Sequence, residues 1–201
     1  MSKIFETPMS MAAFFKASHG IWLNRRAVHH LDHQDDEAAD SNLIIEPFGP
    51  QDLEVSKICN NLNVKTEDCT GGARFWWESN TKKGVRNDDY AAIVIDIPER
   101  NDSRKGFLLR DVGYVEKNSV ISTYSFASDG VLTITTRYDS NIGIERCWFV
   151  TDQLRMRVSS VQCLDGVTMT TYCTEFRCPT DDEIREVAHR ASDLANRTPI
   201  L

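Results

Sequence analysis

Between residues 21 and 177 the sequence is a succession of short segments in which apolar and polar residues alternate, separated by turn signals. Alternation with a period of two residues is typical of β-strands that bury one face. Short strands at regular spacing build a sandwich or a closed barrel, and a run of sequential hairpins favours the up-and-down barrel. The predicted strands span residues 22–32, 41–48, 73–79, 90–97, 107–116, 120–126, 131–138, 144–150, 154–163 and 167–177.

The predicted fold class is therefore mainly β, an antiparallel up-and-down β-barrel. A barrel of about eight to ten strands leaves an interior that holds one small ligand. Two tripeptides, Ser128-Asp129-Gly130 and Leu164-Asp165-Gly166, are typical of hairpin turns. A further polar turn is predicted at residues 34–37.

Two short helices are predicted in the first third of the chain. Ser10 is a suitable N-cap for a helix over residues 11–17, which Gly20 would end. Pro50 suits the first turn of a second, middle helix. That helix has a partial apolar stripe, made of Leu53, Ile58 and Leu62.

Length and composition predict one globular domain over residues 1–201. It consists of a barrel with its N-terminal helix, residues 10–178, and a C-terminal helix, residues 180–195. Thr180 and Glu183 form a capping box at the start of that last helix. The 201 residues suffice to bury a core, and 41% hydrophobic and 26% charged residues are ordinary for a globular protein.

The charge and hydropathy patterns exclude several partners. The net charge of −7 is not offset by any basic segment, which argues against a nucleic-acid partner. No apolar run reaches membrane-spanning length and no signal peptide opens the chain, so we expect no membrane insertion. The protein is expected to stay in the compartment where it is made.

The cysteines and histidines do not form a recognisable metal-binding motif. The six cysteines contain no Cys-x-x-Cys pair, and without a secretory signal free buried thiols are expected rather than disulfides. His29, His30 and His33 are close in sequence, but on a strand 29 and 33 share a face while 30 points away. We therefore predict no metal site.

One predicted hairpin carries an unusual row of polar side chains. Its second strand alternates so that Arg155, Arg157 and Ser159 share one face, and the preceding strand brings Glu145 and Trp148 beside them. Two guanidinium forks suit a ligand with two carboxylates. The alternative is an ordinary solvated strand face.

Taken in order, these residues resemble the S-type phycobiliprotein bilin lyases, the CpcS/CpeS group. The resemblance extends over residues 12–178 and includes an element at residues 72–78 with Trp77 at the tryptophan of the family. Four further blocks carry it: Phe14-Phe15…Ser18…Gly20-Ile21-Trp22…Arg26…His30-Leu31, residues 106–116, the Glu145 to Ser159 hairpin, and Cys173-Thr174-Glu175-Phe176-Arg177.

The resemblance implies a lipocalin-like barrel, similar to fatty-acid-binding proteins. Such a protein takes up a free linear tetrapyrrole, here phycoerythrobilin or phycocyanobilin, as its bound substrate. It then catalyses thioether attachment of that bilin to a cysteine of an apo-phycobiliprotein α or β subunit, which makes it a lyase. The expected location is the cytoplasm of a cyanobacterial-type cell or the plastid stroma.

The chemistry of a bilin can be matched to particular residues. The propionates require arginines, for which we predict Arg155 and Arg157 with Ser159 and Arg26 as further binding residues. The pyrrole N–H groups require a carboxylate, so Glu145 is the first candidate acid/base and Glu175 the second. The rings require apolar walls, predicted from Phe75, Trp77 and Trp148.

Several of these residues also have structural interpretations. Trp22 would close one end of the barrel, and Glu175 could form an ion pair with Arg177 on the same strand face. Cys173 is expected to be a small buried residue rather than a transient bilin nucleophile. Cross-strand ion pairs are the alternative for Arg26 and Arg110, with Asp111 or Glu116.

Two other functions remain open at this point. The first is a carrier that binds a tetrapyrrole or a fatty acid without transferring it, since arginines also bind fatty-acid carboxylates. The second is an accessory subunit of a heteromeric lyase, so both a homodimer and a heterodimer with a related lyase subunit are possible.

Overall fold

The computed structural model describes residues 6–31, 35–79, 91–112, 119–163 and 166–178. Ten antiparallel strands close into one barrel, in the order β1-β10-β9-β8-β7-β6-β5-β4-β3-β2. The predicted fold class is therefore confirmed. In sequence order the strands are β1 (Gly20–His30), β2 (Asp35–Phe48), β3 (Gly71–Ser79), β4 (Ala91–Glu99), β5 (Asp102–Arg110), β6 (Val120–Phe126), β7 (Leu132–Arg137), β8 (Asn141–Thr151), β9 (Leu154–Cys163) and β10 (Gly166–Arg177).

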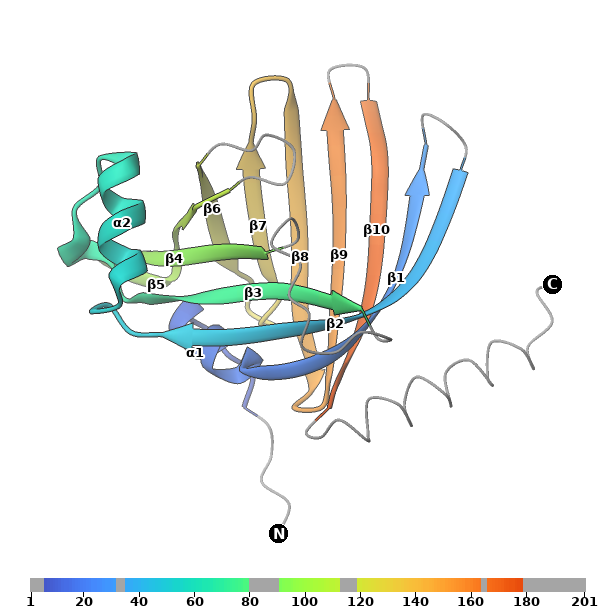
Figure 1. The fold of residues 1–201 in the computed structure, drawn as a ribbon, viewed down its shortest axis with the longest axis horizontal. Coiled ribbons are helices and arrows are strands. Elements are labelled where there is room, and N and C mark those ends of the chain that lie inside the picture. Colours follow the sequence, from blue (N-terminus) through green and yellow to red (C-terminus); the bar gives the residue numbers. More distant parts are fainter. Residues whose placement is uncertain (1–5, 32–34, 80–90, 113–118, 164–165, 179–201) are drawn as a thin grey trace, which may run out of the picture.

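The barrel is built from consecutive hairpins and closes where the first strand pairs with the last. Trp22 on β1 lies opposite Arg177 on β10 and opposite Leu43 on β2. Figure 1 shows β2, β3 and β4 running across the front of the molecule, while β8, β9 and β10 lie roughly vertical behind them. Strands on opposite walls cross in this way because the strands of a closed barrel are tilted against its axis.

The largest differences from the predicted strand bounds are in β2 and β5. The acidic residues Asp35, Asp36 and Glu37 were expected in a turn but belong to β2. The carboxylates of Asp36 and Glu37 contact histidines of β1, with Asp36 Oδ1 2.7 Å from His29 Nδ1 and Glu37 Oε1 3.1 Å from His30 Nε2, so polar residues extend this hairpin. The strand predicted over 107–116 begins at Asp102 and ends at Arg110, because its polar first half also pairs with β4.

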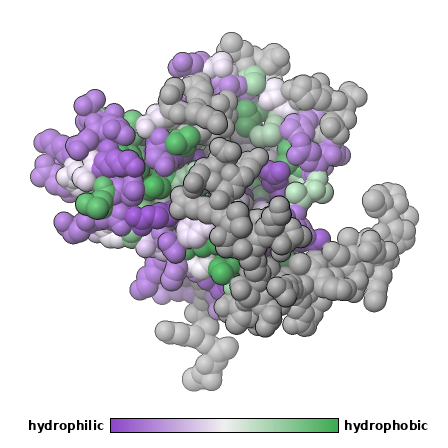
Figure 2. Space-filling view, in the orientation of Figure 1, coloured by the Kyte–Doolittle hydropathy of each residue, from purple (hydrophilic) through white to green (hydrophobic). Residues whose placement is uncertain are grey.

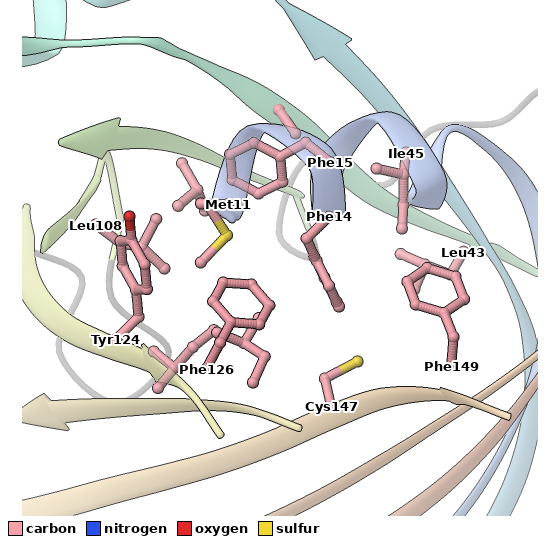
Figure 3. Packing of buried hydrophobic residues seen from close by; sticks show 14 of the residues in the cluster. Met11, Phe14, Phe15, Leu43, Ile45, Leu108, Tyr124, Phe126, Cys147 and Phe149 are labelled. Atoms are coloured by element: carbon pink, nitrogen blue, oxygen red, sulfur yellow. The ribbon is translucent and has the colours of Figure 1, made fainter. Parts of the chain in front are cut away.

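Helix α1 (Met11–Ser18) closes one end of the barrel interior. As predicted, the Ser10 side chain caps it by accepting a hydrogen bond from the Ala13 N–H. Its buried face joins the main core with side chains from eight strands, β1 to β8, and Figure 3 shows Phe14 projecting from α1 toward Cys147. The described core cluster contains Met11, Phe14, Phe15, Trp22, Leu43, Ile45, Ala73, Val94, Leu108, Tyr124, Phe126, Leu132, Ile134, Cys147 and Phe149.

Helix α2 (Leu53–Leu62) covers the outside of the barrel instead. Asp52, not Pro50, begins it, by accepting a hydrogen bond from the Glu54 N–H. The predicted apolar stripe is only partly correct, since Leu53 is 84% exposed. A second core cluster between this helix and the outer face of β4 and β5 contains Val55, Ile58, Cys59, Cys69, Ile95 and Leu109, next to the short 3-10 helix η1 (Thr66–Asp68).

All six cysteines lie within the described residues and are free thiols, as predicted. The helix predicted over residues 180–195 and the turn at Leu164 and Asp165 lie outside the described residues. Figure 2 shows the described part of one face as largely hydrophilic, with scattered apolar residues. Among the described helices, none has the length and apolar character needed to span a bilayer.

Candidate functional site

The polar row on β9 faces the interior of the barrel. Strand pairing places Arg157 between Cys147 of β8 and Cys173 of β10, and places Arg155 opposite Glu175 of β10. Because side chains alternate along a strand, these residues share the inner face. The solvated-face interpretation of this row was therefore wrong, and a cluster of opposite charges lies inside the barrel.

The cluster borders a cavity between α1 and the strands. The space between these side chains is about 550 Å³, its open side included. Most of its wall is apolar. It is lined by Met11, Phe14, Phe15, Leu43, Phe75, Trp77, Val94, Leu108, Arg110, Leu132, Ile134, Glu145, Cys147, Arg155 and Arg157.

Arg155 and Glu175 form the buried base of this cluster. Glu175 is 0% exposed and Arg155 is 2% exposed. The Arg155 Nε donates to Glu175 Oε2 at 2.5 Å, and its Nη1 donates to Ser18 Oγ at the end of α1 at 2.8 Å. The guanidinium also lies 4.9 Å from the Trp22 ring. Arg155 therefore joins the strand wall to the helix that closes the barrel.

Arg157 lies one step further from α1 and contacts more of the cavity. Its Nε donates to Glu175 Oε1 at 3.0 Å, and its Nη1 donates to Glu145 Oε2 at 3.4 Å. Its Nη2 lies 3.4 Å from Cys173 Sγ, and its guanidinium carbon lies 5.9 Å from the centre of the Trp77 ring. A planar guanidinium with five N–H donors can bridge two carboxylates in this way.

The charges in this cluster set the protonation states. Burial alone would raise the pKa of Glu175, but Arg155 and Arg157 outweigh it and hold that pKa below its ordinary value. Glu175 is thus an ionised counterion. Burial raises the pKa of Cys147, which lines the cavity, to about 12 and also raises the pKa of Cys173, so both thiols stay protonated.

A smaller polar group lies toward the tip of the β1–β2 hairpin. Arg26 shares the inner face of β1, and its Nη2 lies 3.8 Å from Glu37 Oε2. His30 Nε2 lies 3.1 Å from the other oxygen of Glu37. Arg26 pairs with Cys173 across the strands but does not line the cavity, and its side chain is 44% exposed.

Comparison with known proteins places the chain in a family. A model of the family described as CpeS-like protein matches residues 10–178. The chain belongs to this CpeS-like family. A chromophore lyase CpcS/CpeS of Synechococcus sp. (strain WH8020) is 59% identical over 200 residues, covering 100% of both chains. The phycocyanobilin lyase subunit CpcS of Picosynechococcus sp. (strain ATCC 27264 / PCC 7002 / PR-6) is 32% identical, covering 90% of this chain and 92% of its own.

A solved structure has the same fold. The S-type phycobiliprotein lyase CPES from Guillardia theta superposes with a TM-score of 0.69 at 26% identity. The match covers 87% of this chain and 96% of that one. The family resemblance seen in the sequence is thus confirmed over the whole barrel.

Most of the residues predicted for the site line the cavity of this CpeS-like barrel or contact residues that line it. Glu145, Arg155, Arg157, Phe75 and Trp77 all line the cavity. Glu175 lies directly behind the two arginines. Ser159 pairs with Glu145 across β8 and β9, outside the cavity lining.

The prediction for Trp148 was wrong. It lies between the buried residues Cys147 and Phe149 on β8 and therefore points to the opposite, outer face, where its strand partner is Met156. Glu145 and Trp148 are an odd number of residues apart, so one strand cannot direct both side chains into the same cavity. Trp148 is not a wall of the site.

Of the structural interpretations proposed from the sequence, the one for Trp22 is confirmed and the one for Glu175 is wrong. Trp22 is fully buried near the closed end, as predicted. Glu175 pairs with Arg155 and Arg157 rather than with Arg177, whose Nε donates to the Asp152 carbonyl at 2.9 Å. Arg26 pairs with Glu37, and Glu116 lies outside the described residues.

Ten of the fifteen lining residues were not predicted as site residues, among them Arg110, Phe14 and Phe15. Arg110, at the end of β5, is buried and lines the cavity, while Asp111 accepts hydrogen bonds from the backbone N–H groups of Ile93 and Val112. Phe14 and Phe15 of α1 form apolar wall. The sequence did contain a signal for Phe14 and Phe15, because both belong to the first family-like block and lie on the apolar face of a predicted helix. A local pattern, however, does not show that this helix enters the barrel.

No group of three or more histidine, cysteine or acidic side chains in the described ranges is arranged to hold a metal ion. The pair His29 and His30 instead contacts Asp36 and Glu37, respectively. His33 lies outside the described residues.

Proposed function

We propose that this protein is a phycobiliprotein chromophore lyase. It binds a free linear tetrapyrrole in the barrel cavity and attaches it to a cysteine of an apo-phycobiliprotein subunit. The observation that carries the proposal is an apolar cavity with a cluster of two arginines and two glutamates on one wall, inside a CpeS-like barrel. A bilin, a flat apolar chromophore with two propionates and a row of pyrrole nitrogens, requires both kinds of surface.

The reaction adds the acceptor thiol across the exocyclic double bond of the bilin. The thiol sulfur bonds to the exocyclic carbon, and the proton that the thiol gives up ends on the ring carbon, so no oxidant or reductant is needed. The lyase must hold one bilin conformation, exclude side reactions and present the reactive end to the acceptor. Its own thiols at Cys147, on the cavity wall, and at Cys173, beside Arg157, are kept protonated by burial and do not compete as nucleophiles.

We propose that Arg157 contacts the ligand directly and that Arg155 acts from behind it. Arg157 touches Glu145 and Trp77 on the cavity side, so it is the guanidinium we assign to a propionate. Arg155 is bound to Glu175, Ser18 and the Trp22 ring, and we assign it to positioning. Trp77 and Phe75 supply wall for the pyrrole rings.

Of the two glutamates, Glu145 suits the acid/base role better. Glu175 is committed to two guanidiniums and its pKa is lowered, so it holds no proton to donate near neutral pH. Glu145 lines the cavity and has one arginine contact at 3.4 Å. A carboxyl group there could hold the pyrrole nitrogens in the protonated, more electrophilic form, which favours attack by the thiol.

The proposal extends to phycoerythrobilin or phycocyanobilin as the bilin and to an α or β subunit as the acceptor. The relative from Picosynechococcus is named as a phycocyanobilin lyase subunit. We therefore keep the accessory subunit of a heteromeric lyase as a second form of the same function, acting in the cytoplasm or the plastid stroma. A carrier that binds a tetrapyrrole or fatty acid without transfer is the alternative that the experiment must separate.

The test combines purified protein, phycocyanobilin or phycoerythrobilin, and a panel of apo-subunits, and compares Glu145→Gln with wild type. We expect wild type to yield a covalent adduct. In Glu145→Gln, bilin binding should change little, the red absorption should weaken, and transfer should slow by about 10²-fold, the range of a lost general acid. The control is Glu46→Gln, at an exposed position of β2.

Each contrary outcome has a distinct meaning. Colour without any adduct on any subunit would identify a carrier. Activity only after a related chain is added would identify an accessory subunit. If Glu145→Gln keeps the wild-type spectrum and transfer rate, Glu145 is not the acid/base.

A further inference from the structure

The interior of the barrel has an apolar half next to α1 and a mainly polar half away from it. The apolar half holds the main core cluster, to which α1 contributes three large side chains. On the far side of Arg157 from α1, the inner faces of β9 and β10 continue with Ser159 and Thr171. Arg155 and Arg157 therefore lie where the two halves meet.

The polar half suits a ligand that carries hydrogen-bonding groups along its edge. The buried hydroxyls of Ser122 on β6 and Thr136 on β7 lie 2.7 Å apart, and Arg26 contacts Glu37 near the tip of the β1–β2 hairpin. A tetrapyrrole brings N–H groups, lactam oxygens and propionates to such surroundings. An acyl chain brings none, so polar groups that it covered would lose water without gaining a partner.

A fatty acid whose carboxylate was bound by Arg157 would thus need the apolar half for its chain. Phe14 of α1 occupies that half and is 5% exposed. Its ring centre lies 5.4 Å from that of Phe149 and 6.1 Å from that of Phe126, and Figure 3 shows Phe14 between these two rings. The guanidinium carbon of Arg155 lies 5.9 Å from the same ring, so Phe14 fills the space between the charge cluster and the aromatic core.

The position of Phe14 is fixed because the end of α1 is bound to the barrel wall. Arg155 Nη1 donates to Ser18 Oγ and Trp22 Nε1 donates to the Ser18 carbonyl oxygen, both at 2.8 Å. The Arg177 guanidinium donates to the carbonyl oxygens of Ala17 and His19. An acyl chain could displace the helix only by breaking these hydrogen bonds.

We propose that Phe14 is a specificity-determining residue, which fills the apolar half of the barrel and thereby excludes an acyl chain from the site. Fatty acids also carry a carboxylate for an arginine, and Phe14 prevents them from competing with the tetrapyrrole. This inference rests on the proposed function for the ligand that does bind. The exclusion itself is tested with a fatty acid.

The experiment titrates dodecanoic acid by calorimetry and biliverdin by absorption into wild type and Phe14→Ala. Apolar space opened by truncating a core side chain stays dry and accepts apolar ligands. Phe14→Ala should therefore bind dodecanoic acid about tenfold or more tightly than wild type, the factor expected from burying two further CH₂ groups. Biliverdin, whose polar edge keeps it in the polar half, should gain less than about threefold.

Two control variants separate the opened space from a loss of stability. Phe14→Leu keeps a large apolar side chain, so it should bind dodecanoic acid as wild type does. Ile58→Ala removes a buried side chain from the cluster beneath α2, outside the barrel, and should bind both probes as wild type does. If Phe14→Ala does not fold, Met11→Ala replaces it, because Met11 is buried in the same apolar half.

Failure of this inference is distinguishable from failure of the proposed function. The role of Phe14 is overturned if wild type and Phe14→Ala bind dodecanoic acid equally, or if Ile58→Ala gains as much as Phe14→Ala. If wild type binds no biliverdin and forms no adduct, the proposed function fails, and the comparison with dodecanoic acid still decides whether Phe14 excludes acyl chains.

Discussion

Glu175→Gln tests the central claim about the interior cluster, that this carboxylate is the counterion of two buried arginines. The substitution keeps the shape of the side chain and removes its charge. It leaves Arg155 and Arg157 with an amide oxygen in place of two carboxylate oxygens at 2.5 and 3.0 Å. The electrostatic attraction that offsets their burial is then lost.

The magnitude follows from those two contacts. Each hydrogen bond to a charged group contributes about 1.5–3 kcal/mol, and the amide oxygen of glutamine can replace part of one such bond. Breaking a buried ion pair by removing one partner costs about 3–5 kcal/mol, so we expect the free energy of unfolding to fall by about that amount. For a chain of 201 residues this corresponds to a melting temperature lower by roughly 6–20 °C.

The same variant should change how stability depends on pH. The pKa of Glu175 is lowered by folding, so its contribution is fully present above the ordinary value of 4.5 and is lost as the pH falls through the folded value. Wild type should therefore lose stability below about pH 4.5, and Glu175→Gln should lose less over the same range. The difference between the two proteins should shrink as the solution becomes more acidic.

Urea denaturation at several pH values measures both effects. The control is Glu37→Gln, whose side chain is 55% exposed next to Arg26, where an exposed pair is worth less than about 1 kcal/mol. If Glu175→Gln is as stable as Glu37→Gln at pH 7, or if its pH curve runs parallel to that of wild type, the buried counterion role is refuted.

Two further predictions concern packing away from the cavity. The Sγ atoms of Cys59 and Cys69 are 3.4 Å apart, so a mild disulfide oxidant should join them and raise the free energy of unfolding by about 3 kcal/mol; peptide mapping that finds Cys163 linked instead would contradict this geometry. A Cβ added at Gly72 would meet the Val94 carbonyl oxygen and the Phe48 ring, so Gly72→Ala should cost about 1–3 kcal/mol by thermal denaturation, whereas Gly49→Ala, with open space around it, should cost much less.

Much of the strand pattern was predictable because it is local. Apolar and polar residues alternate directly along the sequence, as in Leu154, Arg155, Met156 and Arg157. The bounds of β6 and β9 agree with the prediction. The Ser10 cap is local in the same way, since it depends on a side chain and an N–H three residues apart. The start of β2 was missed because its acidic residues resemble a turn until their basic partners on β1 are known.

The site was only partly predictable. The sequence named both cavity arginines of β9 and the glutamate of β8, because family-like blocks and alternation mark them together. It also placed Trp148 with Glu145, although their odd separation directs them to opposite faces. It could not separate the roles of Arg155 and Arg157, because their different partners, Ser18 of α1 for Arg155 and Glu145 for Arg157, come from other elements.

By itself, then, the sequence determined the succession of strands, the family and the polar row of β9. The tertiary structure decided that this face is the inside, that α1 enters the barrel to contact Arg155 through Ser18, and that Arg110 of β5 borders the same cavity as Arg157. The physical reason is barrel closure. Trp22 meets Arg177 only when the first strand pairs with the last, and contacts between segments so far apart in sequence leave no periodicity for a local pattern to reveal.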